Sequence, residues 1–580
     1  MSRKYSFDTV STVTMSRSRL NMGRRVKTSM RVGDLVPIDI REVLPGDNWT
    51  CHEGHLVRLS TAYLRPVMDT AFMDVYSFFV PLRLLYEDYE EVFGNASPNG
   101  YVQEELGHFP RFSDEGLNYL NIASKSVGDY LGLPVGYCLP DISVLPFRAF
   151  ALVYEEWFRN ENTVSPMLVQ KGELSTTEYP NNNAWRPDNY TGKLPKVGKK
   201  NDYFTSCLPA PQKGAPVEFG IAGTAPVNVT GSFNYPVFMV NNDGLHRKIF
   251  TPDLIDPLNN LVKGKTLGVS DTGFLSQDLE STFPASGHTS AAASMSLVAA
   301  PNASLQSVRS SGTVDLSNIS AVNVNDLRFA FQLQKMLEKD ARGGGRYREY
   351  LLTHYGVHNA DARMQIPEFL GGKRTPLNLQ QVAQTSKGDS DSPLASLAGY
   401  SQTLGRSGYR KAFTEHGYIL TVACIRYEHS YQQGIDRSWF RYKREDFYDP
   451  LFANIGEQPV YTSQLYGFFN SQPDGLKSVR DRVFGYQEAW AEYRYAPDII
   501  TGEMRSSAQN SFDVYHFADN YENAPVLNEQ FTNENPTFFR RTTAIGEDAD
   551  VDDFLVDFYF DTYAYRVMPV RSIPGLVDHH

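Results

Sequence analysis

The chain has 580 residues, of which 41% are hydrophobic, 13% aromatic and 21% charged, and its formal net charge is −12. It contains 35 Phe and 34 Tyr but only 5 Trp, and its 33 Pro and 43 Gly occur throughout the sequence. This composition excludes a disordered chain and a coiled coil, and it favours a mainly β protein with long loops.

The cysteines and the apolar runs exclude two further classes of protein. Cys51, Cys138, Cys207 and Cys424 lie far apart and offer no CxxC pair for a metal or a redox couple. The longest apolar runs, such as VYSFFVPL, are much shorter than the ~20 residues of a membrane-spanning helix. We therefore expect free thiols in a reducing cytoplasm, no metal or other cofactor, and no membrane insertion.

The N-terminal arm, residues 1–33, differs in charge from the rest of the chain. Residues 1–31 hold eight basic side chains and one acidic side chain, a net charge of +7 that leaves −19 for the remainder. A basic arm on an acidic body is typical of a protein that meets nucleic acid at one end, although the arm could instead reach a neighbouring subunit. Its composition predicts no regular structure in isolation. The candidate DNA-binding residues are Arg3, Lys4, Arg17, Arg19, Arg24, Arg25, Lys27 and Arg31.

Residues 34–216 form the first part of the predicted core and contain strand and helix patterns. The run LVPIDIREVLPGD predicts a strand, and the continuous apolar run MDVYSFFVPL predicts a strand buried on both faces. The next segment, LLYEDYEEVFG, indicates a short helix that ends at Gly94. A second helix is indicated by VLPFRAFALVYEEWFRNE, and we expect it to begin near Pro146.

Residues 217–325 differ in composition from their surroundings. Between residues 266 and 325 there are 13 Ser and 5 Thr but only five charged residues, and few large apolar side chains could anchor a core. A long stretch of this kind inside a compact protein is either a functional surface insertion or a disordered linker.

Residues 326–580 return to clear periodic patterns. A helix is expected from near Asn325 to the glycines at 343–345, and a second helix, YREYLLTHYG, is expected to stop at Gly356. Strands are predicted by YILTVACIRYE, near Tyr418, and by DFLVDFYFDTYAYRV, near Asp553, in which aromatic and aliphatic residues alternate.

The motifs that suggest chemistry fail in detail. Gly343 to Gly345 follow a helix and lack the Lys-Ser/Thr of a phosphate loop, so a helix stop is expected. The segment His52-Glu53-Gly54-His55 has only one residue between Glu53 and His55, whereas the zinc-binding pattern His-Glu-x-x-His has two, and there is no Gly-x-Ser-x-Gly elbow. We expect no catalytic residue, although a glycoside hydrolase would need only two suitably spaced carboxylates.

One internal segment mixes cations with aromatic rings. Trp439, Phe440 and Tyr442 stand among its basic residues, and such a mixture is typical of surfaces for single-stranded nucleic acid. Aromatic residues and Arg are equally enriched where proteins contact each other, so a subunit interface or a core position is the alternative. The candidate DNA-binding residues of this segment are Arg437, Arg441, Lys443 and Arg444.

Several blocks of sequence resemble a known family. They are EVLPGDNW, PVMDTAFMDVYSFFVPLRLLYEDYEEVFG, LPAPQKG, EKDARGGGRYREYLLTHYGVHNADARMQIPEFLGG, FTEHGYILTVACIR with SYQQGIDRSWFRYKREDFYDPLFANIGEQPV, FGYQEAWAEYRY and PVRSIPGLVDH. Together they resemble the major capsid protein of gokushovirus-type microviruses, small icosahedral phages with single-stranded DNA. The resemblance spans nearly the whole chain except residues 217–325.

The resemblance implies a fold and an assembly. The fold is a single eight-stranded antiparallel jelly roll with long insertions that contain short helices. The assembly is an icosahedral shell of about sixty copies around circular single-stranded DNA, with the basic arm inside and residues 217–325 forming a protrusion at the threefold axis. The alternative is a β-sandwich adhesin or glycan-binding protein that forms no shell.

The resemblance also implies partners and a location. The expected partners are further copies of the chain, the packaged DNA, a small basic DNA-binding protein, a pilot protein and a host cell-surface receptor. We expect the chain in the virion, after assembly in the cytoplasm of the bacterial host. The candidate host-attachment residues are Thr266, Ser286, Ser294, Asn302 and Asn318.

Overall fold

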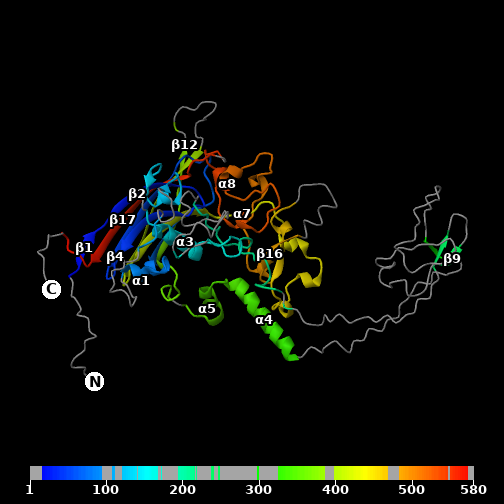
Figure 1. Cartoon of the computed structure of the whole chain (residues 1–580). Helices are drawn as coiled ribbons and strands as arrows, with labels where there is room; N and C mark the ends of the chain where they lie inside the picture. The colour runs from blue at the N-terminus through cyan, green and yellow to red at the C-terminus, as the bar shows by residue number, and fades with distance from the viewer. Residues whose placement is uncertain are drawn as a thin grey trace, which may run out of the picture. The chain divides into compact units, whose positions relative to one another are not determined.

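The computed structural model describes residues 16–93, 108–111, 120–139, 142–167, 171–172, 194–215, 217, 237–240, 246–248, 297–299, 324–358, 360–383, 385, 397–467, 482–546 and 549–571 (Figure 1). The chain divides into two compact units. One unit consists of Met1–Pro216 with Leu333–His580, and the other of Val217–Gln332. The first unit is mainly β with antiparallel sheets and few helices, as predicted.

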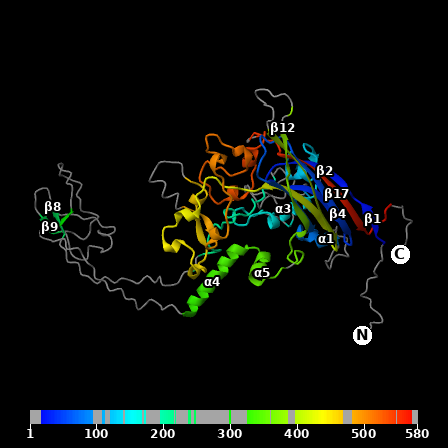
Figure 2. The same ribbon diagram turned by 180° about the vertical axis from the view of Figure 1, so that it is seen from behind.

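Six strands of the first unit form its larger sheet. They are β1 (Ser18–Asn21), β2 (Arg24–Met30), β4 (Asn48–Leu59), β12 (Leu379–Ala383), β13 (Leu397–Ala412) and β17 (Phe554–Arg566). The order across the sheet is β1–β17–β4–β13–β12, and β2 also pairs with β17. The last strand of the chain therefore lies between early strands, red between blue in Figures 1 and 2.

Four further strands form the smaller sheet. They are β3 (Val36–Val43), β5 (Ala71–Pro81), β11 (Glu368–Pro376) and β14 (Gly417–Tyr427), in the order β11–β5–β14–β3. Strand pairs within the two sheets are nested in sequence. β2 pairs with β17 and β4 with β13 in the larger sheet, and β3 pairs with β14 and β5 with β11 in the smaller sheet. Among these eight strands, the chain changes sheet at each step except between β5 and β11.

The two sheets share one hydrophobic core. Alternate residues of β17, from Phe554 to Phe560, are buried as the sequence predicted, and they join Val75 and Ile425 of the smaller sheet in one cluster. Each such large apolar side chain contributes about 1.5–3 kcal/mol when it leaves water. Packing of the two sheets against each other therefore fixes the register of β17, because a slip of one residue would move its buried side chains to the solvent face.

Strand β5 is buried on both faces, which confirms the prediction from its continuous apolar run. Phe79 joins a cluster with Trp49 of the larger sheet. The neighbouring Phe78 points to the other face, where its ring centroid lies 5.3 Å from that of Trp157. Trp157 is the last residue of helix α3 (Leu145–Trp157), so α3 covers the face of the smaller sheet that points away from the core.

Helix α3 begins one residue before Pro146, as expected, whereas the helix predicted at residues 84–93 is reduced. Only a 3-10 turn, η1 (Leu82–Leu84), and the short helix α1 (Tyr89–Phe93) form there, and Gly94 lies outside the described residues. The buried Arg148 of α3 donates to the carbonyl of Leu85 at 2.9 Å. That carbonyl is therefore occupied by a side chain rather than by a helical amide.

Two helices follow the predicted patterns closely. Helix α4 (Val324–Gly343) begins one residue before the expected cap and ends at the triple glycine, where Gly344 has a φ of +95°. Helix α5 (Tyr347–Tyr355) ends at Gly356, which has a φ of +65°. Glycine adopts such left-handed conformations at little cost, so both helix stops have a direct cause in the sequence.

The remaining elements are short. In the first unit, β6 (Leu120–Asn121) pairs with β7 (Cys138–Leu139), and β15 (Gln458–Tyr461) with β16 (Val483–Gln487). In the second unit, β8 (Val237–Val240), β9 (His246–Lys248) and β10 (Leu297–Ala299) form a three-stranded sheet. The other helices are α2 (Val127–Tyr130), α7 (Glu529–Thr532), α8 (Thr537–Arg540), η5 (Arg437–Phe440), η6 (Arg444–Asp446), η7 (Pro450–Phe452), η8 (Thr462–Gln464), η9 (Ala491–Tyr493), η10 (Gly502–Met504) and η11 (Asp513–Tyr515).

The basic arm differs from its prediction, because β1 and β2 lie within residues 1–33. Both strands pair with β17. Val26 and Met30 of β2 pack against the core. The arm has too few apolar residues to order itself, but the unpaired edge of an apolar strand such as β17 supplies both backbone partners and a surface to cover.

Candidate functional site

The basic residues of β1 and β2 fall on two faces of the larger sheet. Arg19, Arg25 and Lys27 are exposed, and Arg17 is exposed just before β1. The register places Arg25 opposite Tyr559, and its guanidinium carbon lies 5.4 Å from the centroid of that ring. Three of the predicted DNA-binding cations of the arm therefore share the solvent face of the sheet.

Arg19 makes the closest of these stacking contacts. Its guanidinium carbon lies 4.1 Å from the centroid of the Tyr563 ring. A cation over an aromatic face is attracted by the negative charge density of the ring. The arginine and the tyrosine therefore form a flat pair at the surface of β17.

Two other predicted residues of the arm are engaged within the chain. Arg24 forms an ion pair with the buried carboxylate of Asp39, which also accepts from Nε of Arg41 at 2.9 Å. Arg31 forms an ion pair with Asp550, at 2.6 Å. These contacts favour a role for Arg24 and Arg31 in holding the strands together. Arg3 and Lys4 lie outside the described residues.

The basic segment at residues 437–444 is held mainly by a single carboxylate. Glu492 lies 3.5 Å from Nε of Arg437 and 3.3 Å from Nη2 of Arg441. Arg441 also stacks over the ring of Tyr493, at 4.3 Å from its centroid. Lys443 and Arg444 are exposed. Two of the four cations predicted to contact DNA are thus paired inside the protein.

The same part of the chain exposes large apolar side chains. Trp439 is 75% exposed, Tyr442 79% and Leu451 87%. We call the exposed apolar residues of this stretch the apolar segment; they are Ile435, Trp439, Tyr442, Phe447, Tyr448, Leu451, Phe452 and Ile455. Apolar surface gathered in this way is typical of a contact with another protein. The geometry favours the interface interpretation of this segment over the DNA interpretation.

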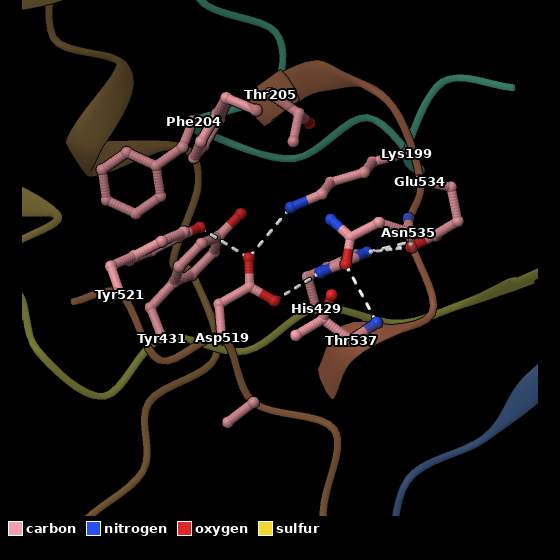
Figure 3. Close-up of polar contacts among 12 residues, drawn as sticks. Lys199, Phe204, Thr205, His429, Tyr431, Asp519, Tyr521, Glu534, Asn535 and Thr537 are labelled. Atoms are coloured by element: carbon pink, nitrogen blue, oxygen red, sulfur yellow. Dashed lines mark hydrogen bonds and ion pairs between the residues drawn. The ribbon is translucent and has the colours of Figure 1, made fainter. Parts of the chain in front are cut away.

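A buried charged cluster lies just beyond the C-terminal end of β14 (Figure 3). His429 stands between two carboxylates: its Nδ1 lies 2.7 Å from Asp519 and its Nε2 lies 3.1 Å from Glu534. Nζ of Lys199 lies 3.0 Å from Asp519, and the hydroxyl of Tyr521 donates to the same carboxylate at 2.6 Å. We call these five residues the buried charge cluster.

Charge pairing sets the protonation of this cluster. Burial by itself would lower the pKa of His429, but the carboxylates of Asp519 and Glu534 outweigh it and raise this pKa to about 9. The pKa of Asp519 is lowered: burial opposes ionisation, but the charges of His429 and Lys199 outweigh it. Below about pH 9 the imidazolium therefore donates from both nitrogens. The side chains of His429, Lys199, Asp519 and Glu534 are at most 1% exposed, so the cluster ties segments together and offers no surface to a substrate.

The other motifs take structural positions. His55 is buried and lies 2.8 Å from Glu53, whereas His52 points to the opposite face of β4. The turn amide of Gly345 donates to Glu161 at 2.6 Å, which supports a helix stop at this position. Within the described ranges there is no group of three or more His, Cys, Asp or Glu that could hold a metal ion. No helix among those residues is long and apolar enough to cross a membrane.

The candidate host-attachment residues, Thr266, Ser286, Ser294, Asn302 and Asn318, all lie outside the described residues. Their role stays a prediction.

Comparison with known proteins then decides the family. The model of the phage capsid protein (F protein) family matches residues 8–576, almost the whole chain. The chain belongs to this capsid protein family.

Three relatives of the chain are capsid proteins. The chain is 36% identical to capsid protein VP1 of Spiroplasma virus 4, over 97% of this chain and 95% of that protein. It is 35% identical to capsid protein VP1 of Chlamydia phage 1 and 34% identical to that of Bdellovibrio phage phiMH2K, in each case over 99% of this chain and 98% of the relative. The resemblance to gokushovirus-type microviruses is confirmed.

Membership of this family makes the chain a structural capsid protein and not an enzyme. The hydrolase alternative is thereby set aside, and the place of the chain is the virion.

Sequence reasoning missed part of the basic surface and the whole buried charge cluster. Arg58, Arg406 and Arg410 stand exposed on the same sheet face as Arg25, and no run of basic residues marks them. A signal was present, because alternation in β17 places Tyr559 and Tyr563 opposite to the buried row. For the cluster there was none, since its members come from four distant parts of the chain.

Proposed function

We propose that this capsid protein is an eight-stranded jelly roll that assembles with about sixty copies of itself into an icosahedral shell around circular single-stranded DNA. The observation that carries the fold proposal is the nested pairing of β2 with β17, β3 with β14, β4 with β13, and β5 with β11. Such nesting arises when one long antiparallel hairpin is rolled into two facing sheets, which is the jelly-roll arrangement. The strands β1 and β12 extend the larger sheet.

The apolar segment supports self-assembly. Leu451 and Trp439 expose more apolar surface than an isolated subunit in water favours, and Arg437 and Arg441 beside them pair with Glu492. A second copy of the chain is the partner that a capsid protein meets at every subunit boundary. Burial of these side chains between copies would supply hydrophobic stabilisation to the shell.

The basic arm supports the DNA proposal. Its net charge of +7 over residues 1–31 could neutralise packaged phosphates from inside the shell. A small basic DNA-binding protein and a pilot protein would be further partners, and assembly would occur in the cytoplasm of the bacterial host. Residues 217–325 would form the protrusion that contacts a host receptor, through Thr266, Ser286, Ser294, Asn302 and Asn318.

The experiment is expression of the full chain followed by negative-stain electron microscopy and sedimentation. We expect closed isometric particles. Monomers or small oligomers alone, over a range of salt and pH, would contradict the shell and favour the alternative of an adhesin or glycan-binding protein.

A paired variant tests the apolar segment. Leu451→Asp together with Trp439→Ala should abolish particles while the subunit keeps the circular dichroism spectrum and melting temperature of the native chain. Met68→Asp is the control, because Met68 is 76% exposed but lies outside the segment. Particle yields that fall equally in both variants, or in neither, would remove the segment from the subunit interface.

A further inference from the structure

The solvent face of the larger sheet carries a row of tyrosines along β17. Inward residues of this strand fill the core, and the intervening residues point outward. Tyr559 is 47% exposed and Tyr565 is 42% exposed, with Tyr563 between them on the same face. Because a tyrosine in a sheet normally gains from burial, three of them along one outward row indicate a surface that something flat can cover.

Cations flank this row on the β1 and β2 side. The register sets Arg19 opposite Tyr565 and Arg25 opposite Tyr559, while their guanidinium groups stack on Tyr563 and Tyr559. A guanidinium plane on a phenol ring leaves its outer surface open to a further planar group. Nucleobases stack on both aromatic side chains and guanidinium planes.

More cations flank the row on the β4 and β13 side. Arg58, Arg406 and Arg410 are exposed and lie on the outward positions of these two strands. Gly54 lies between Tyr559 and Arg406 in the register and has no side chain to separate them. A Cβ at Gly54 would meet only a backbone oxygen at 3.9 Å, so the space above this residue is open.

The balance of charge on the face is positive. Its cations are Arg19, Arg25, Lys27, Arg58, Arg406 and Arg410, and its acidic residues are Asp557 and Asp561. Lys27 stands opposite Asp557 in the register, and His52 opposite Asp561. The arginines beside the tyrosines have neither aspartate opposite them in the register, so they can bind an anion from solution. We call this set of cations and the three tyrosines the tyrosine–arginine face.

We propose that the tyrosine–arginine face binds single-stranded nucleic acid, with bases stacked on Tyr565 and on the guanidinium planes that cover Tyr559 and Tyr563, and with the other arginines in contact with phosphates. This inference rests on the proposed function and assigns the DNA contact to a folded sheet surface in addition to the arm. Exposed aromatic faces favour unpaired bases, since the bases of a duplex are already stacked on each other. An acidic protein segment would pair with the arginines but would gain little from three ring faces.

The binding test uses the full-length protein and a fluorescein-labelled oligothymidylate, followed by fluorescence anisotropy over a salt series. Arg406→Gln with Arg410→Gln should weaken binding and lower the magnitude of the salt slope by about 1.4, since each phosphate contact to a single strand contributes about 0.7. Tyr559→Leu with Tyr565→Leu should weaken binding by roughly tenfold or more and leave the salt slope unchanged. The two variants thus separate charge from stacking.

Matched variants guard against loss of folding and against general charge effects. Tyr559→Phe with Tyr565→Phe keeps the rings and should bind like the native chain. Lys335→Gln with Lys339→Gln removes two exposed cations from α4 and should leave affinity and slope unchanged. An oligouridylate should bind comparably to oligothymidylate, whereas a duplex of the same length should be insensitive to the tyrosine change.

Three results would overturn the proposal: native affinity in both the arginine and the tyrosine variants, equal weakening in the Lys335 and Lys339 control, or equal loss of duplex and single-strand binding in the tyrosine variant. Electron microscopy of the same preparations tests shell formation independently of oligonucleotide binding. Intact particles with unchanged oligonucleotide binding would refute the face and leave the shell standing, whereas absence of particles from the native chain would refute the shell.

Discussion

Burial and charge act in opposite directions at His429. The imidazole is enclosed by protein, yet its pKa is raised to about 9 because Asp519 and Glu534 face its two nitrogens. In the unfolded chain the same group titrates near ~6.5. The folded state therefore binds the proton more tightly. Stability from this source is complete below about pH 6.5 and is lost as the pH rises through about 9.

The corresponding variant is His429→Gln. It leaves two buried carboxylates without the imidazolium between them, and we expect it to lower the free energy of unfolding by about 3–5 kcal/mol. The native chain should also lose stability between about pH 6.5 and about pH 10, and the variant should lose much less. Urea unfolding at both pH values measures the two effects.

His52→Gln is the matched control, since His52 is exposed on β4. This control should stay within about 0.5 kcal/mol of the native chain. If the variant at position 429 showed the same alkaline loss as the native protein, the pH dependence would have to come from another group.

At the scale of an element, the glycine turn between α4 and α5 gives the next prediction. Gly344 has a φ of +95°, and a Cβ there would lie 2.1 Å from the carboxylate of Glu349, which accepts from the backbone amide of Arg346, the residue that caps α5. Gly356 has a φ of +65°, and a Cβ there would meet nothing within 4 Å. Both positions carry the strain of a left-handed residue, but only the first carries a steric clash.

We expect Gly356→Ala to lower the free energy of unfolding by about 1 kcal/mol, from backbone strain alone. Gly344→Ala should lower the free energy of unfolding further, since the Glu349 side chain must also move away from the amide that it caps. Thermal unfolding of the two variants beside the native chain provides the comparison. Equal losses would mean that Glu349 relocates freely and that its capping contact contributes little.

Elements with a strong local pattern were predictable from the sequence. The alternation of β17, the continuous apolar run of β5 and the glycine stops of α4 and α5 each encode their structure within a few residues. The strands β1 and β2 carry weak patterns of their own. They form because they pair with β17, which is distant in the sequence. The residues of the arm alone do not indicate that partner.

The sites show the same division. Runs such as the basic residues at 437–444 are visible in the sequence, yet the structure pairs Arg437 and Arg441 with Glu492, about fifty positions away. The surface of β4 and β13 was not visible, because Arg58 and Arg406 come onto the same sheet face only through the register of two strands. Candidate residues that depend on tertiary pairing therefore required the structure.

At the scale of the whole molecule, the second unit, Val217–Gln332, has internal contacts of its own. Replacement of residues 217–323 with a short Gly/Ser linker keeps the whole of α4 and should leave the first unit folded, since the entropy of closing a loop changes slowly with its length. We expect particles to form and adsorption to the host to fall. Electron microscopy and an adsorption assay measure the two outcomes.

Exposed single substitutions provide the matching control for that deletion. Thr266→Ala and Asn302→Ala should reduce adsorption without any change in particle yield if the unit contacts a receptor. Insoluble protein after the deletion, combined with normal adsorption of the two substituted chains, would make the unit structural and refute the attachment role.

The nested strand order also governs when the protein can complete its fold during synthesis. Ser29 and Asp552, which share a hydrogen bond beside the junction of β2 and β17, are 523 positions apart. A nascent chain on the ribosome therefore holds β2 and β4 without the strand that joins them, and both edges stay open until residue 566 emerges. Chains broken off earlier keep those edges unpaired and are substrates for proteases and chaperones. We therefore expect that only chains synthesised through β17 can complete the larger sheet and become subunits of a shell.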